Sequence, residues 1–138
     1  MMDHSEEKRF AEKYIRKSRR ERVVFELTSS KRRYEGLSRF CHQAGELLDP
    51  KRMLMTGEDL DRREDFLRFV KEHDERCFIM SPDPWLDGEY MDTAAAVAQG
   101  IHSMDAVIIM GSDFAVVFGE VMKGGRGKYL LNENNKKK

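Results

Sequence analysis

Four carboxylates in one short stretch are the residues of this sequence best placed to do chemistry. The stretch 83–92, DPWLDGEYMD, contains Asp83, Asp87, Glu89 and Asp92. Clustered carboxylates can bind a divalent cation, so a metal-assisted enzyme with its site at these residues is one hypothesis. An EF-hand calcium loop that began at Asp83 would need a carboxylate or amide at its third position and glutamate at its twelfth. Those positions hold Trp85 and Ala94, which excludes that loop.

The only tryptophan of the chain lies in the same stretch. Trp85 belongs to residues 81–88, which contain two prolines and one glycine, a composition typical of a loop. An aromatic side chain there is either an exposed anchor for a protein partner or a lid folded over the core, and the sequence leaves both open. Together with its acidic neighbours Asp83 and Asp87, Trp85 is the predicted partner-binding site.

Eight cations within eighteen residues form the most conspicuous charge feature. They are Arg16, Lys17, Arg19, Arg20, Arg22, Lys31, Arg32 and Arg33. Such a segment could neutralise several phosphates, so a nucleic-acid-binding regulator is another hypothesis. The alternative is a solvated helix face, since Glu21 and Glu26 are interspersed among the cations.

The glycine-rich stretch GGRGK, residues 124–128, does not match a phosphate-binding P-loop. That motif requires a glycine five positions before its Gly-Lys pair and Ser or Thr directly after it. Met122 and Tyr129 occupy those positions. A turn between strands explains the glycines better, because glycine readily adopts positive φ.

No arrangement of Cys, Ser and His indicates nucleophilic catalysis. Cys41 and His42 are neighbours on a predicted helix, so their side chains point about 100° apart. Cys41 and Cys77 both lie in apolar patterns, which predicts small buried residues with free thiols. The sequence therefore predicts no catalytic residue, no metal and no cofactor, and it favours a non-catalytic protein.

The elements that must position these residues are organised around an apolar hairpin. Residues 106–110 and 114–118 are two apolar runs separated by Gly111-Ser112-Asp113. Each run is continuously apolar, whereas a strand with one wet face would alternate. We therefore expect an antiparallel hairpin that is covered on both faces.

Helices and further short strands surround this hairpin. Residues 4–27 are predicted to form a long basic helix, with a strand at 22–27 as the alternative, and residues 31–48 form the clearest amphipathic helix. The remaining elements are strands at 52–56, 76–80 and 128–131, and helices at 61–73 and 89–103. The order predicts an α+β fold with two layers, a mixed sheet of about five short strands and three to four covering helices. Residues 1–131 are expected to form a single domain, and residues 132–138 a frayed polar tail.

Composition narrows the class of protein. The chain has 138 residues, of which 40% are hydrophobic and 36% charged, too apolar for a disordered protein. Its net charge is zero, but the charges are unevenly distributed. Residues 1–34 contain eleven basic and six acidic residues, and residues 122–138 contain six basic residues and one acidic residue. Residues 35–121 contain eight basic and eighteen acidic residues, so basic ends flank an acidic middle. The start of the chain is charged and no run is long enough to span a bilayer, so a cytoplasmic protein without membrane contact is expected.

These observations give three functional hypotheses in order of preference. The first is a small non-catalytic protein that docks on a protein partner, of the inhibitor or immunity type, through Trp85, Asp83 and Asp87. The second is the nucleic-acid-binding regulator that uses residues 16–33, and the third is the metal-assisted enzyme. No motif is specific enough to indicate a family, an identified partner or an oligomeric state.

Overall fold

The computed structural model describes residues 4–119, 121 and 126–134, without the side chain of Cys41. Its helices are α1 (Ser5–Tyr14), α2 (Arg20–Thr28), α3 (Arg33–His42), α4 (Ala44–Leu47), α5 (Glu64–Glu72) and α6 (Thr93–His102), with short 3-10 helices η1 (Lys17–Arg19), η2 (Pro50–Arg52) and η3 (Leu60–Arg62). Its strands are β1 (Met53–Thr56), β2 (Arg76–Met80), β3 (Tyr90–Asp92), β4 (Val107–Met110), β5 (Phe114–Phe118) and β6 (Lys128–Asn132). The predicted α+β class is confirmed. Residues 124 and 125 of the predicted glycine turn, and 135–138 of the predicted tail, lie outside the described ranges.

All six strands form one sheet in the order β1-β6-β5-β4-β2-β3, and every neighbouring pair is antiparallel. The predicted hairpin is confirmed, with Ile108 opposite Val117. The prediction of about five strands is one short, and the prediction of a mixed sheet is wrong.

The missing strand explains both differences. β3 has only three residues, and the sequence assigned them to the start of a helix at 89–103. β3 pairs antiparallel with β2, Met91 lying opposite Cys77, and so reverses the chain before α6 begins. A strand, one helix and a second strand would give a parallel pair, whereas the extra reversal makes β2 and β4 antiparallel.

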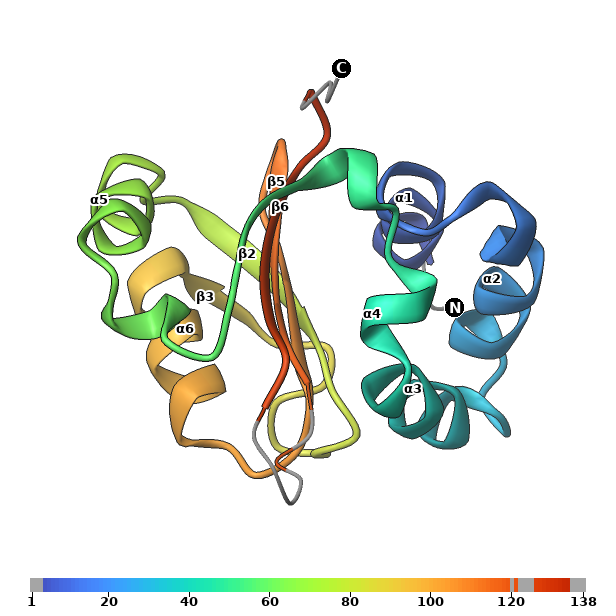
Figure 1. Cartoon of the computed structure of the whole chain (residues 1–138). Helices are drawn as coiled ribbons and strands as arrows, with labels where there is room; N and C mark the ends of the chain where they lie inside the picture. The colour runs from blue at the N-terminus through green and yellow to red at the C-terminus, as the bar shows by residue number, and fades with distance from the viewer. Residues whose placement is uncertain (1–3, 120, 122–125, 135–138) are drawn as a thin grey trace.

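Helices cover both faces of this sheet, which gives three layers (Figure 1). The helices α1–α4 pack on one face, and α5 and α6 pack on the other. The predicted two layers with three to four helices are therefore wrong. The continuously apolar hairpin already required cover on both sides, and that expectation is confirmed, since every residue of β4 and β5 is buried.

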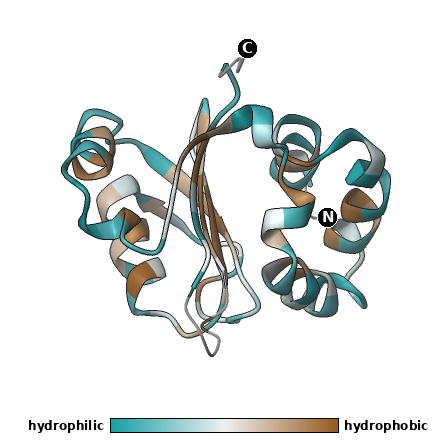
Figure 2. Cartoon of the chain, in the orientation of Figure 1, coloured by the Kyte–Doolittle hydropathy of each residue, from teal (hydrophilic) through white to brown (hydrophobic). Residues whose placement is uncertain are grey.

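Alternate residues of the hairpin enter two separate cores. The core beneath α1–α4 receives Ile108, Met110, Ala115 and Val117. The core beneath α5 and α6 receives Val107, Ile109, Phe114, Val116 and Phe118. Figure 2 shows the result, with hydrophobic central strands between helices that mix hydrophobic and hydrophilic residues.

The basic N-terminal segment forms two helices where one was predicted. α1 ends at Tyr14 because Ile15 is extended and pairs with Leu48 in an isolated antiparallel bridge. The backbone N–H of Asp49 donates to the Tyr14 carbonyl at 2.8 Å. After η1 the chain continues as α2, so helix rather than strand is confirmed for residues 22–27.

The predicted helix at 31–48 is also divided. Gln43, with φ −117° and ψ 17°, separates α3 from α4. The helices that result are short, and among the residues described here none is both long and apolar enough to cross a membrane.

Candidate functional site

Residues 81–89, which connect β2 to β3, form a loop held by its own hydrogen bonds. The Ser81 hydroxyl donates to the carbonyl oxygen of Ala106 at 2.6 Å and accepts from the backbone N–H of Asp83 at 3.1 Å. Asp83 Oδ1 in turn accepts from the backbone N–H of Trp85 at 2.9 Å. Asp83 therefore has a clear structural role, since its carboxylate stabilises the turn that presents Trp85.

Trp85 projects from this turn into solvent. Its side chain is 85% exposed, whereas the next residue, Leu86, is buried. The loop returns to the sheet at Gly88, which has a φ of 83° and donates its N–H to the carbonyl oxygen of Ile79 at 2.8 Å. Of the two alternatives for Trp85, the lid folded over the core does not fit this exposure.

Asp87 fastens the loop to the helical layer beneath it. Both of its carboxylate oxygens accept from Arg33, Oδ2 from Nε and Oδ1 from Nη2, each at 2.8 Å. Such a two-point pair fixes orientation as well as distance. Asp87 was predicted to bind a partner and Arg33 to bind nucleic acid, but the two residues bind each other.

Arg33 also holds a buried carboxylate. Its Nη1 donates to Glu7 Oε2 at 2.6 Å and to the Leu27 carbonyl at 2.8 Å, and the Glu7 side chain is only 1% exposed. Burial by itself would lower the pKa of Arg33, but its hydrogen bonds to Asp87 and Glu7 raise it above the ordinary value. Arg33 is therefore a permanently charged link between α1, the end of α2 and the loop that carries Trp85.

The four carboxylates of residues 83–92 are not brought together as a group of metal ligands. Asp83 and Asp87 are engaged in the loop, and Glu89 and Asp92 are exposed. Across the described part of the chain, no three His, Cys, Asp or Glu side chains come together in a way that could hold a metal ion. No geometric observation therefore favours the metal-assisted enzyme.

The cysteine prediction can be tested at one of its two positions. Cys77 is buried, and its Sγ lies 3.4 Å from Thr93 Oγ1. Burial raises the pKa of its thiol, which disfavours the reactive thiolate. Cys77 is confirmed as a small core residue, while the side chain of Cys41 lies outside the description.

The eight predicted cations divide into two groups. Arg20 Nε donates to the carbonyl oxygen of Ile15 at 2.9 Å, and Arg32 lies over the ring of Phe25 at 5.8 Å. With Arg33, these residues are used within the chain itself. The other five cations are exposed, and their side chains make no such contact with a backbone carbonyl or an aromatic ring among the described residues. They are Arg16, Lys17, Arg19, Arg22 and Lys31.

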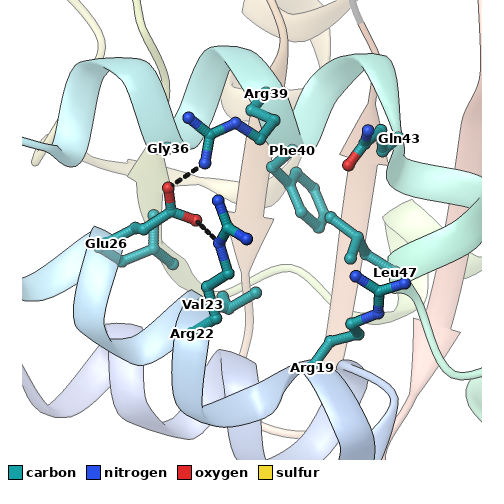
Figure 3. A pocket seen from close by; sticks show the side chains of 10 residues that line it. Arg19, Arg22, Val23, Glu26, Gly36, Arg39, Phe40, Gln43 and Leu47 are labelled. Atoms are coloured by element: carbon teal, nitrogen blue, oxygen red, sulfur yellow. Dashed lines mark hydrogen bonds and ion pairs between the residues drawn. The ribbon is translucent and has the colours of Figure 1, made fainter.

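A pocket lies on the basic side of the molecule, between α2 and α3 (Figure 3). It has a volume of about 260 Å³. It is lined by Arg19, Arg22, Val23, Glu26, Leu27, Gly36, Arg39, Phe40, Gln43 and Leu47. We call it the α2–α3 pocket, and it combines an arginine rim with an apolar floor.

Glu26 organises the rim of this pocket. Its Oε2 accepts a hydrogen bond from Arg39 Nη1, and its Oε1 lies 3.6 Å from Arg22 Nε (Figure 3). Gly36 makes the close approach of the two helices feasible, because a Cβ atom there would lie 2.8 Å from the Cβ of Glu26. The sequence identified Arg19 and Arg22 as candidate nucleic-acid contacts, but it did not identify Arg39 or Glu26 as site residues.

A signal for some of the missed residues was present in the sequence. Glu7 precedes Phe10 and Tyr14 at helical spacing, so a carboxylate stands on the buried stripe of α1 and requires a cationic partner. Arg22 and Glu26 are four residues apart, a spacing that favours an ion pair once the segment is known to be helical. Nothing in the sequence places Arg39 opposite Glu26, because that contact depends on how α2 and α3 pack.

Comparison with known proteins does not assign the chain to a family. No family model matches the sequence, and no curated protein or solved structure is detectably similar to it. The function has to be inferred from the geometry and chemistry of the loop and the pocket.

Proposed function

We propose that this chain is a small non-catalytic binding protein that docks on a protein partner through Trp85. The observation that carries the proposal is the 85% exposure of Trp85, in the middle of a loop whose other residues are held by hydrogen bonds. Tryptophan is enriched among the residues that dominate binding energy at interfaces. A large apolar side chain that its own chain leaves in water has the most to gain from a partner.

The bracing of the loop supports the same proposal. Asp83 fixes the turn, and the pair of Asp87 with Arg33 ties the loop to the helical layer. An anchor that is already ordered loses less conformational entropy when it binds. The exposed Glu89 and the partly exposed Asp83 give the anchor an acidic surround, so the complementary partner offers an apolar cleft with a basic rim.

The test uses Trp85 itself as the probe. Because it is the only tryptophan, its fluorescence reports on this loop alone. Binding of a partner isolated with the full chain is expected to shift the emission to shorter wavelength as the indole leaves water. Trp85→Ala is expected to weaken the complex by about 2 kcal/mol or more, as for other interface hot spots.

Phe25→Ala is the matched control. Phe25 is another exposed aromatic residue, on α2, and its truncation is expected to leave the affinity within about 0.5 kcal/mol. A partner that binds wild type and Trp85→Ala equally well would remove Trp85 from the interface.

Nucleic-acid binding is the second candidate, favoured by the exposed cations Arg16, Lys17, Arg19 and Lys31. If four such residues neutralise phosphates, the affinity for DNA or RNA falls steeply between low and physiological salt. Absence of binding at low salt would end this proposal.

A further inference from the structure

The α2–α3 pocket has more positive charge and more hydrogen-bond donors than its own residues use. Three guanidinium groups, of Arg19, Arg22 and Arg39, line the pocket, and Glu26 is the only carboxylate among its lining residues. Each guanidinium has five N–H donors, yet Glu26 receives one hydrogen bond, from Arg39, and one longer ion pair, from Arg22. The side chain of Arg19 has no hydrogen-bond or ion-pair partner among the residues the structure describes. The pocket is therefore short of negative charge.

The floor of the pocket has a different chemistry. It is formed by the apolar side chains of Val23, Leu27, Phe40 and Leu47. The Phe40 ring packs edge-on against Phe10, with centroids 5.5 Å apart, which fixes its orientation. A ligand that fills this hollow therefore needs an apolar part as well as an anionic part. The volume of about 260 Å³ is slightly below the range of drug-sized ligand sites and suits a small molecule.

We propose that the α2–α3 pocket binds a small phosphate monoester whose organic group is apolar. A phosphate monoester carries close to two negative charges at neutral pH, which balances three arginines and one glutamate. Guanidinium groups bind phosphate oxygens in a two-point geometry. In this proposal the phosphate binds the guanidinium groups of the rim, Arg19 among them, and the apolar group packs on Val23, Phe40 and Leu47.

The surroundings favour a small molecule over a nucleic acid strand. A strand needs cations along a continuous path, but Arg20, Arg32 and Arg33, which would extend the path, bind groups of their own chain. Glu26 also stands inside the rim and would repel a run of phosphates that passed over it. This proposal concerns a different site from Trp85 and does not depend on the proposed function.

The test is calorimetric titration of the full chain with phenyl phosphate at slightly alkaline pH. We expect saturable binding of one molecule per chain. Arg19→Gln is the decisive variant, because Arg19 supports no other described residue and its loss should leave thermal unfolding unchanged. It is expected to weaken binding about tenfold or more, the loss typical of one charge-assisted hydrogen bond. Inorganic phosphate, which has no apolar group, is expected to bind about tenfold more weakly than phenyl phosphate.

Arg16→Gln is the matched control, since Arg16 is exposed nearby but does not line the pocket. It removes the same charge and is expected to change the affinity by about twofold at most. Equal losses in both variants would mean diffuse attraction and would overturn the proposal. So would absence of saturable binding at about 1 mM phenyl phosphate, equal affinity for inorganic phosphate, or tighter binding of a single-stranded oligonucleotide without terminal phosphates.

Discussion

The two faces of the sheet are covered in different ways. Under α5 and α6 the contacts are apolar and aromatic: Phe66 is fully buried, and the ring of Phe69 stacks on His73 with centroids 3.7 Å apart. Phe114 of β5 packs edge-on against Phe69, with centroids 5.4 Å apart. The core on this face is hydrophobic and is stabilised by the apolar area that it buries, while charged groups contact its margin, where Arg126 lies over the ring of Phe118 and Lys128 pairs with Asp61.

The helices on the other face add charge to their apolar contacts. Glu7, Arg33 and Asp87 form one chain of ion pairs between α1, α3 and the β2–β3 loop. Glu26 and Arg39 form another between α2 and α3. Pairs of this kind add little net stability compared with apolar packing, but they fix which groups face each other.

Both candidate sites depend on the charged layer and not on the apolar one. The α5–α6 layer stabilises the sheet, and the α1–α4 layer holds both candidate sites: it braces the Trp85 loop through Arg33 and forms the α2–α3 pocket. Substitutions under α5 and α6 should therefore change stability alone. Substitutions in the charged layer should change stability less and binding more.

The largest expected effect is in the apolar layer. Phe66→Ala should lower the free energy of unfolding by about 3–5 kcal/mol, because it removes a fully buried ring and leaves a cavity. Urea denaturation followed by circular dichroism measures the loss. Leu67→Ala, at the exposed neighbouring position of α5, should change stability by about 0.5 kcal/mol at most. Equal effects at the two positions would contradict the assignment of α5 to a buried core.

Arg33→Met should have the second largest effect, and it should change both the stability of the chain and the mobility of the Trp85 loop. It leaves Glu7 buried without its cationic partner and releases Asp87, so a loss of about 3 kcal/mol is expected. Arg32→Met, at the exposed neighbouring position, should cost less than about 1 kcal/mol. Fluorescence anisotropy of Trp85 should fall in Arg33→Met, since the loop is no longer tied to α3. Unchanged anisotropy would show that the loop does not need this bracing.

Much of the architecture could be predicted from local sequence patterns, and each wrong prediction has a specific physical cause. The hairpin, β1, β2 and β6 could be predicted because their apolar runs are bounded by turn residues. β3 could not, since three residues that include Tyr90 and Asp92 carry no periodicity, and their strand depends on pairing with β2. That one omission also explains why the sheet is antiparallel where a mixed sheet was predicted.

The sequence could indicate which residues are candidates for a site, but not which residues of the same chain they contact. Composition was enough to single out Trp85 and the basic segment. Asp87 and Arg33 were assigned to different partners because they lie fifty-four positions apart in sequence, and only folding brings them together. Arg39 was missed for the same reason, since α2 and α3 must pack before it can face Glu26.

A smaller effect should test the packing of α2 against α3. Gly36→Ala adds a Cβ that would lie 2.8 Å from Glu26 Cβ, so the helices must move apart. The overpacking cost of about 1–3 kcal/mol exceeds the helix-propensity gain of about 1 kcal/mol, so a net destabilisation of about 1 kcal/mol is expected. Gly45→Ala on α4 is the control, because its Cβ meets only the movable hydroxyl of Tyr129 at 3.0 Å, and a neutral or favourable change is expected. Equal thermal stability of the two variants would mean that α2 and α3 can move apart at little cost, so that the shape of the α2–α3 pocket is not fixed.

An effect of similar size, limited to neutral pH, is expected where Asp61 of η3 accepts a hydrogen bond from Lys128 Nζ of β6 at 2.7 Å. Partial burial alone would raise the pKa of Asp61, but the hydrogen bond and charge of Lys128 lower it below its ordinary value of 3.8. Because the folded pKa is depressed, the stabilisation is present above the unfolded pKa and is lost as pH falls through the folded one. Asp61→Asn should therefore cost about 1 kcal/mol at neutral pH, measured by urea denaturation, and the difference from wild type should vanish in acid. A constant difference between Asp61→Asn and wild type at all pH values would assign the effect to packing instead of charge.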